Sequence, residues 1–190
     1  MKETEITVQV FDNFAKIDET LKNKGFKMVE NYQLNDWYFS KIDNVLDMEY
    51  LDLINNSFLV REIIDATPQI QLCYKSKHLD DKGNVIYEEK EKTNLADLKS
   101  SLKVFTLAGL NNYCKVENNS YVYEKGKTSF VVQIIKDLGI FIEYEEDETM
   151  KNLTPQEKFE YMKNVLNKLG LKLGTDFSCK KVFMLLHKNN

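Results

Sequence analysis

The sequence predicts an α+β protein, namely a closed or nearly closed antiparallel β-barrel with helices packed on its outside. Three stretches of the 190 residues share one order of elements: a strand carrying Glu-x-Glu, a capped helix that ends at a glycine, and a returning strand. Further strand-like runs lie between these units. No low-complexity segment or long linker divides the chain, so we expect a single domain over 1–190.

The first unit opens with KETEITVQV, whose period of two places Glu3 and Glu5 on the face opposite the apolar residues. Its strand, helix and returning strand are expected at 2–10, 12–25 and 27–40. Asp12 is the expected helix cap, and Gly25 is expected to close the helix.

The other two units repeat this order. The second is expected at 84–92, 93–110 and 111–117, and the third at 139–147, 153–170 and 179–188. Glu89 and Glu91 again stand two apart, as do Glu143 and Glu145. Thr154 begins a capping box, which makes the last helix strongly specified. Further strands are expected at 57–64, 68–77, 120–127 and 129–135, with turns at 78–84 and 124–127.

Three Glu-x-Glu strands in one chain indicate polar faces that converge on a shared interior. Carboxylates gathered there would repel one another unless cations were present. The sequence has no cluster of His or Cys, so hard divalent ions with oxygen ligands, Mg²⁺ or Mn²⁺ before zinc, are the expected cations.

Composition limits the possible partners and surroundings. The formal charge of −4 and the pI near 5.4 argue against general affinity for nucleic acid or an anionic membrane. No apolar run approaches the length of a membrane span, and no signal-peptide pattern opens the chain. Three widely spaced cysteines fit reduced thiols, so a cytoplasmic location is expected. Arg61 is the only arginine.

Several motifs occur in an order that resembles a known family. They are Glu3-x-Glu5, Asp36-x-Tyr38-Phe39, the strand SFLVREII, LCYK with Lys75, Glu89-x-Glu91, NYCKVE with Lys115, and Leu138-Gly139-x-Phe141-x-Glu143-x-Glu145. Over nearly its whole length the chain resembles the CYTH superfamily of triphosphate tunnel enzymes. This superfamily includes class IV adenylyl cyclases, thiamine triphosphatases and inorganic tripolyphosphatases.

The resemblance implies a role for each group of residues. The metal ligands would be Glu3, Glu5, Glu143 and Glu145; the phosphate-binding residues would be Arg61, Lys75 and Lys115; Glu89 and Glu91 would complete the metal shell or orient a nucleophile. Four positions depart from the family pattern by losing a basic or acidic group, namely Thr7, Leu59, Glu117 and Gln133.

The leading hypothesis is therefore a metal-dependent enzyme acting on a triphosphate. It would be class IV adenylate cyclase-like, converting ATP to cyclic AMP and pyrophosphate, or a triphosphate phosphohydrolase. One alternative is a tunnel that binds a nucleotide or polyphosphate without turnover, because key basic residues are lost. A third is an interaction module with merely solvated polar faces. The expected partner is ATP, thiamine triphosphate or tripolyphosphate, without nucleic acid or membrane, and a homodimer is left open.

Overall fold

The computed structural model describes residues 2–79 and 85–188, apart from the side chains of residues 2, 3, 85 and 86. The turn expected at 78–84 thus lies largely outside the described residues. Nine antiparallel strands form one sheet in the order β1-β6-β5-β4-β3-β7-β8-β9-β2. Their bounds are β1 Lys2–Glu3, β2 Glu5–Val10, β3 Lys27–Ser40, β4 Ser57–Ile64, β5 Gln69–Leu79, β6 Val85–Asn94, β7 Asn111–Lys125, β8 Thr128–Ile135 and β9 Gly139–Glu145.

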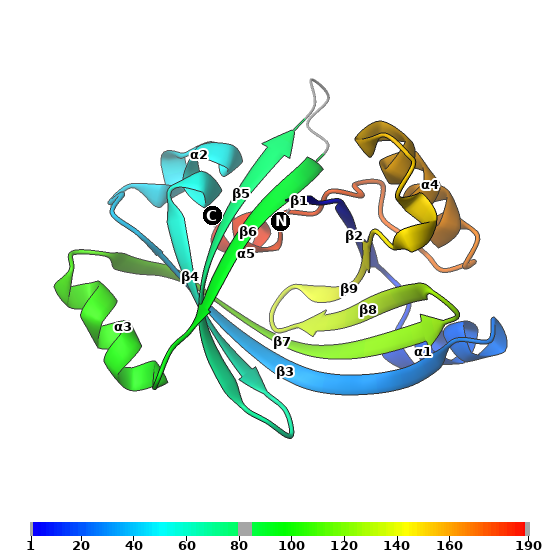
Figure 1. Cartoon of the computed structure of the whole chain (residues 1–190), viewed down its shortest axis with the longest axis horizontal. Coiled ribbons are helices and arrows are strands. Elements are labelled where there is room, and N and C mark those ends of the chain that lie inside the picture. Colours follow the sequence, from blue (N-terminus) through cyan, green and yellow to red (C-terminus); the bar gives the residue numbers. More distant parts are fainter. Residues whose placement is uncertain (1, 80–84, 189–190) are drawn as a thin grey trace.

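The first strand of the chain closes this sheet into a barrel. β1 and β2 are separated only by Thr4, yet β1 pairs with β6 and β2 pairs with β9, at the two ends of the strand order. Figure 1 shows the resulting ring of strands. The expected closed or nearly closed antiparallel barrel is confirmed, although the runs expected at 111–117 and 120–127 form the single strand β7.

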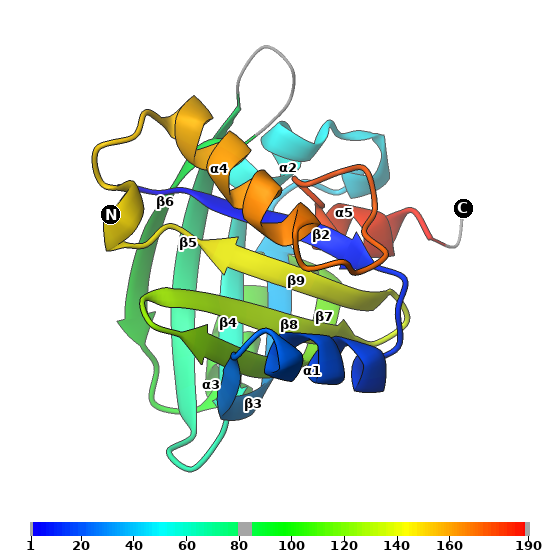
Figure 2. The same cartoon turned by 90° about the vertical axis from the view of Figure 1, so that its right-hand side faces the viewer.

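Two helices cover the outer face of β2, β8 and β9 (Figure 2). They are α1 (Phe14–Asn23) and α4 (Pro155–Asn167). Their buried residues join one core with the outward-facing apolar residues of the strands, including Ile6, Val8, Ile17, Leu21, Phe159 and Met162. The capping box at Thr154 is confirmed, whereas α1 is capped by the side chain of Asn13 rather than Asp12. Asp12 instead accepts a hydrogen bond from the backbone of Lys172.

A third helix, α3 (Leu98–Leu107), packs against the opposite side of the barrel. Asp97 caps it by accepting from the Ser100 backbone N–H. Its apolar residues contact a small core formed by Phe39 on β3, Val60 on β4 and Leu110 just before β7. The helices expected near 93–110 and 153–170 are thus confirmed outside the barrel.

One end of the barrel is covered by α2 (Tyr50–Asn55) and α5 (Lys181–Leu186), as Figures 1 and 2 both show. Tyr50, Ile54 and Val182 pack there with apolar residues of the barrel, namely Val116, Ile135 and Phe141. The strand expected at 179–188 was wrong, because a short apolar run fits a helix as well as a strand by its period alone. Helix α2 was not predicted.

Two short 3₁₀ turns complete the fold, at Val45–Asp47 and Glu148–Met150. None of the helices in the described ranges is long and apolar enough to cross a membrane.

Candidate functional site: a charged pocket inside the barrel

The barrel encloses a pocket of about 280 Å³. This volume lies near the lower end of the roughly 300–1,000 Å³ usual for small-molecule sites. Among the described residues, the acidic side chains lining it are Glu5, Asp36, Glu143 and Glu145, and the basic ones are Arg61, Lys75, Lys77, Lys90, Lys92 and Lys181. Tyr50, Ile54 and Val182 line it where α2 and α5 cover the barrel. The pocket therefore suits a compact, strongly charged ligand.

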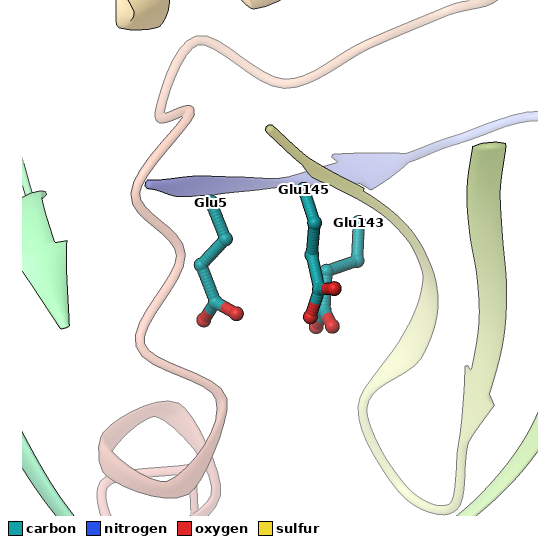
Figure 3. Close-up of side chains that lie close together, drawn as sticks. All are labelled: Glu5, Glu143 and Glu145. Carbon is teal, nitrogen blue, oxygen red and sulfur yellow. The ribbon is translucent and has the colours of Figure 1, made fainter. Parts of the chain in front are cut away.

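Three carboxylates form a cluster at the β2–β9 seam. Glu5 lies opposite Glu145 in the ladder, and Glu143 lies two residues further along the same face of β9. One oxygen from each of the three carboxylates lies within 4.8 Å of the others, and Figure 3 shows the side chains pointing the same way. Three carboxylate oxygens with no sulfur or imidazole fit the ligand preference of Mg²⁺ or Mn²⁺.

The fourth expected metal ligand, Glu3, lies on β1, and its backbone pairs with Glu88 of β6. Its side chain is outside the described residues, so it stays a prediction. The other three expected metal ligands are brought together.

A wall of lysines on β5 and β6 faces this cluster. Alternate residues of each strand point inward, and Lys75 pairs with Lys90 across the ladder. Between them lies the carboxylate of Glu88, which is fully buried. Its oxygens lie 2.8 Å from the Nζ of Lys77 and 3.3 Å from those of Lys75 and Lys90. Burial raises the pKa of Glu88, but Lys75 and the other lysines outweigh it and hold the pKa below its usual value.

Glu5 links the acidic cluster to the lysine wall. Its two carboxylate oxygens lie 3.3 Å from Lys77 Nζ and 3.1 Å from Lys90 Nζ. Burial raises the pKa of Glu5, yet the surrounding lysines, with Lys77 the strongest, lower it well below its usual value. Burial disfavours the charged form of Lys77 and so lowers its pKa, but interactions with Tyr50, Glu5 and Glu88 outweigh burial and raise the pKa above its usual value. Glu5 and Lys77 are thus both charged at neutral pH.

Arg61 lines the pocket from β4 and is held by Asp36, its direct neighbour on β3. Its Nε donates to Asp36 Oδ1 at 2.8 Å, and its Nη2 donates to Oδ2 at 2.7 Å. The side chains are 19% and 5% exposed. This parallel pair of charge-assisted hydrogen bonds fixes the plane of the guanidinium group.

The C-terminal helix α5 adds one more cation. Lys181 Nζ donates to Glu143 Oε2 and to Gln133 Oε1, both at 2.7 Å. Gln133 Nε2 also donates to Glu143 Oε2, at 3.3 Å. Gln133 thus connects a carboxylate of the cluster to the helix that covers the barrel.

Two sets of expected site residues lie elsewhere, because the inward face of their strand is shifted by one residue. On β6 the inward residues are Glu88, Lys90 and Lys92, so the structure places Glu89 and Glu91 on the exposed outer side. The structure therefore does not bring this expected catalytic pair to the pocket.

Lys115 also lies outside the barrel, since Val116 and Asn118 are the residues of β7 that line the pocket. It pairs with Glu117 at 2.8 Å, and Lys136 pairs with the other oxygen of the same carboxylate at 2.8 Å. Hydrogen bonds from these two lysines lower the pKa of Glu117 to about 2. The structure therefore does not bring Lys115 to the pocket, where the expected phosphate-binding role would place it.

Several residues that line the pocket were missed from the sequence, namely Asp36, Lys77, Lys90, Lys92 and Lys181, as was Glu88, which is buried against the lysines. Asp36 was matched to the family motif but given no role. The alternations Lys75-x-Lys77 and Glu88-x-Lys90-x-Lys92 were the signal that could have identified the lysine wall. Of the four departures from the family pattern, Thr7 and Gln133 line the pocket, and Leu59 is buried two residues from Arg61 on β4.

Comparison with known proteins gives the fold a wider context. No family model matches the chain. A protein of Methanocaldococcus jannaschii named "Putative adenylate cyclase MJ0240" is 26% identical over 172 residues, which cover 90% of this chain and 91% of the relative. The PH1819 protein of Pyrococcus horikoshii superposes with a TM-score of 0.74 at 18% identity, covering 98% and 99% of the two chains.

A Hippeastrum protein gives a further match. The Hippeastrum protein HpAC1 is described as a "putative adenylyl cyclase" with a dominant triphosphatase activity, and it superposes with a TM-score of 0.67 at 13% identity over 99% and 96% of the chains. The chain has the same fold as these solved structures. In this barrel, the Glu-x-Glu strands from the first and last parts of the sequence are direct neighbours, β2 beside β9.

Proposed function

We propose that the protein is a metal-dependent enzyme that acts on a small triphosphate inside the barrel. The observation that carries this proposal is the pairing, in one pocket, of a three-carboxylate cluster with a wall of lysines and an oriented arginine. The names of the M. jannaschii and Hippeastrum proteins support a triphosphate as substrate.

The proposed roles follow from the charges. Glu5, Glu143 and Glu145 would hold Mg²⁺ or Mn²⁺, which would neutralise phosphate oxygens and stabilise charge that develops in the transition state. Lys75 and Lys77 would bind phosphate as point charges, since both line the pocket. Lys77 also lies next to the acidic cluster, because its Nζ contacts Glu5.

Arg61 would bind phosphate through the guanidinium edge that Asp36 leaves open. Asp36 takes Nε and one terminal nitrogen, so the remaining N–H donors are directed elsewhere. In a cyclase the ribose 3′-hydroxyl would attack the α-phosphorus and pyrophosphate would leave. In a hydrolase water would attack a terminal phosphorus.

Binding without turnover is the second candidate, and Thr7 favours it. The family signature has a lysine at this position, whereas Thr7 is buried, lines the pocket and offers no charge. Lys77, Lys90 and Lys92 supply other positive charges on the facing strands, which favours the enzyme.

The test is product analysis by anion-exchange chromatography after incubation with ATP, thiamine triphosphate or tripolyphosphate, each with Mg²⁺ and with Mn²⁺. Cyclic AMP with pyrophosphate identifies a cyclase, and orthophosphate identifies a hydrolase. The variant Glu143→Gln/Glu145→Gln is expected to lose the activity, because it removes two of the three carboxylates without changing side-chain size.

The variant Glu89→Gln/Glu91→Gln is the matched control, since it removes two carboxylates from an exposed outer face with the same spacing. Loss of activity in this control would support the catalytic role that the sequence predicts for Glu89 and Glu91. Binding of all three compounds without any product would favour the second candidate, and no binding at all would reject both.

A further inference from the structure

The feature that the proposed function leaves unused is the lysine at the start of α5. Lys181 reaches the acidic cluster from outside the sheet, and its Nζ lies 2.7 Å from Glu143 Oε2. Its side chain is 23% exposed and that of Glu143 is 15% exposed. The ammonium group therefore sits against one of the three carboxylates that would hold a metal ion.

Each carboxylate of the cluster is already beside an ammonium group. Glu5 pairs with Lys77 and Lys90, and the Glu145 Oε1 lies 3.7 Å from Lys90 Nζ. Lys77 and Lys90 come from β5 and β6, two long strands of the barrel wall that pair with each other. Glu143 is different, because its paired cation comes from a six-residue helix at the end of the chain.

A divalent ion and an ammonium group cannot share the same carboxylate oxygen without strong repulsion. Lys181 has four rotatable side-chain bonds, so it can turn away while its helix stays in place. When Lys181 leaves, Gln133 still donates to Glu143 Oε2 and so keeps that carboxylate oriented. Metal entry at Glu143 then requires a new partner for the displaced ammonium, and a phosphate group in the same pocket is such a partner.

We propose that Lys181 occupies the cation position at Glu143 until a metal-bound triphosphate enters, so that free divalent metal binds weakly and metal and triphosphate bind together. This inference rests on the proposed function. It assigns Lys181 as a residue that sets the order and coupling of ligand binding. It also gives Gln133 the role of holding Glu143 in both states.

The test measures Mn²⁺ binding by electron paramagnetic resonance of free Mn²⁺, without and with tripolyphosphate. Lys181→Met is expected to tighten binding of Mn²⁺ alone by at least about tenfold, which equals about 1.4 kcal/mol. The coupling between Mn²⁺ and tripolyphosphate is expected to shrink, because the same displacement is no longer needed for either ligand. Lys181→Arg keeps the cation and should bind Mn²⁺ alone as weakly as the wild type.

Lys180→Met is the matched control: it removes the same charge one residue earlier, where the Nζ lies 5.1 Å over the Tyr50 ring rather than on the cluster. It should leave the Mn²⁺ affinity unchanged. Lys181→Gln serves as a second variant, and thermal unfolding of each variant verifies that it folds. A Lys181→Met protein that folds and binds Mn²⁺ no more tightly than the wild type overturns the inference, as does equal tightening in Lys180→Met.

The two proposals fail in different ways. Tighter Mn²⁺ binding in Lys181→Met, with no binding of tripolyphosphate by any variant, would reject the proposed function and the joint binding while confirming the competition at Glu143. Turnover of tripolyphosphate by the wild type, with unchanged Mn²⁺ affinity in Lys181→Met, would support the function and overturn the inference.

Discussion

The pairing of Asp36 with Arg61 provides a quantitative test of the pocket's geometry. Replacing Asp36 with Asn keeps the size of the side chain but removes its charge and one of the two acceptors. Removing one partner of a buried ion pair costs roughly 3–5 kcal/mol, because the other charge stays buried in the protein interior without a counter-charge. The Arg61 side chain is 19% exposed and can regain some hydration, so we expect the lower value, about 3 kcal/mol of unfolding free energy.

A double-mutant cycle separates the pair from other effects. Arg61→Met should lower the unfolding free energy by a similar amount, because the Asp36 side chain, only 5% exposed, then loses the cation with which it pairs. In the double variant neither charge is left unpaired, so its loss should be smaller than the sum of the single losses by about 2 kcal/mol. Urea unfolding is the assay, and Trp37, the only tryptophan and the neighbour of Asp36, supplies the fluorescence signal.

The ligand provides the second half of the test. Asp36→Asn releases part of the Arg61 guanidinium, so tripolyphosphate should raise the stability of this variant more than that of the wild type. A coupling energy below about 0.5 kcal/mol would refute the reasoning, because exposed ion pairs already reach that value. Equal stabilisation of both proteins by tripolyphosphate would contradict the expectation that releasing the Arg61 guanidinium strengthens phosphate binding.

Three further predictions concern single side chains. Lys75→Met should weaken tripolyphosphate binding, measured by calorimetry, at least about tenfold, whereas Lys115→Met, on the outer face, should leave it unchanged; equal losses would place Lys115 at the ligand. The pKa of Glu5 is lowered in the fold from its usual 4.5, so its contribution to stability is present above pH 4.5 and is lost as the pH falls through the lowered pKa. Stability of Glu5→Gln, followed by urea unfolding from pH 6 to 3, should therefore decline less than that of the wild type, and an equal decline would contradict this. Thr154→Ala should cost about 1 kcal/mol in urea unfolding, because it removes the capping box of α4, and a loss below about 0.3 kcal/mol would argue against that cap.

The sequence predicted most of the strands and three outer helices because their signals are local. Alternation, caps and glycines identify an element without knowledge of its neighbours, as in the capping box at Thr154. Helix α2 and helix α5 were missed because each is six residues long and takes its stability from packing at the barrel end.

The acidic cluster was predictable for a similar reason, since Glu5, Glu143 and Glu145 alternate with apolar residues that must face the outer helices. The lysine wall was harder. In the stretch EEKEK both faces of the strand are charged, so hydrophobic alternation does not specify which residues point inward. The choice between Glu88 and Glu89 is set by pairing with β5 and β1, which a single strand does not reveal.

The seam between β2 and β9 has a consequence for how the chain is made. β2 is synthesised well before its partner β9, which begins only at residue 139, so the barrel cannot close until this later strand is available. Pairing across such a separation is slow. Until it occurs, the backbone edge of β2 is unpaired and its apolar face is exposed. The acidic cluster spans this same seam, with Glu5 on one side and Glu143 on the other. An ion that bridged them would bind only the closed ring, and so would hinder its reopening.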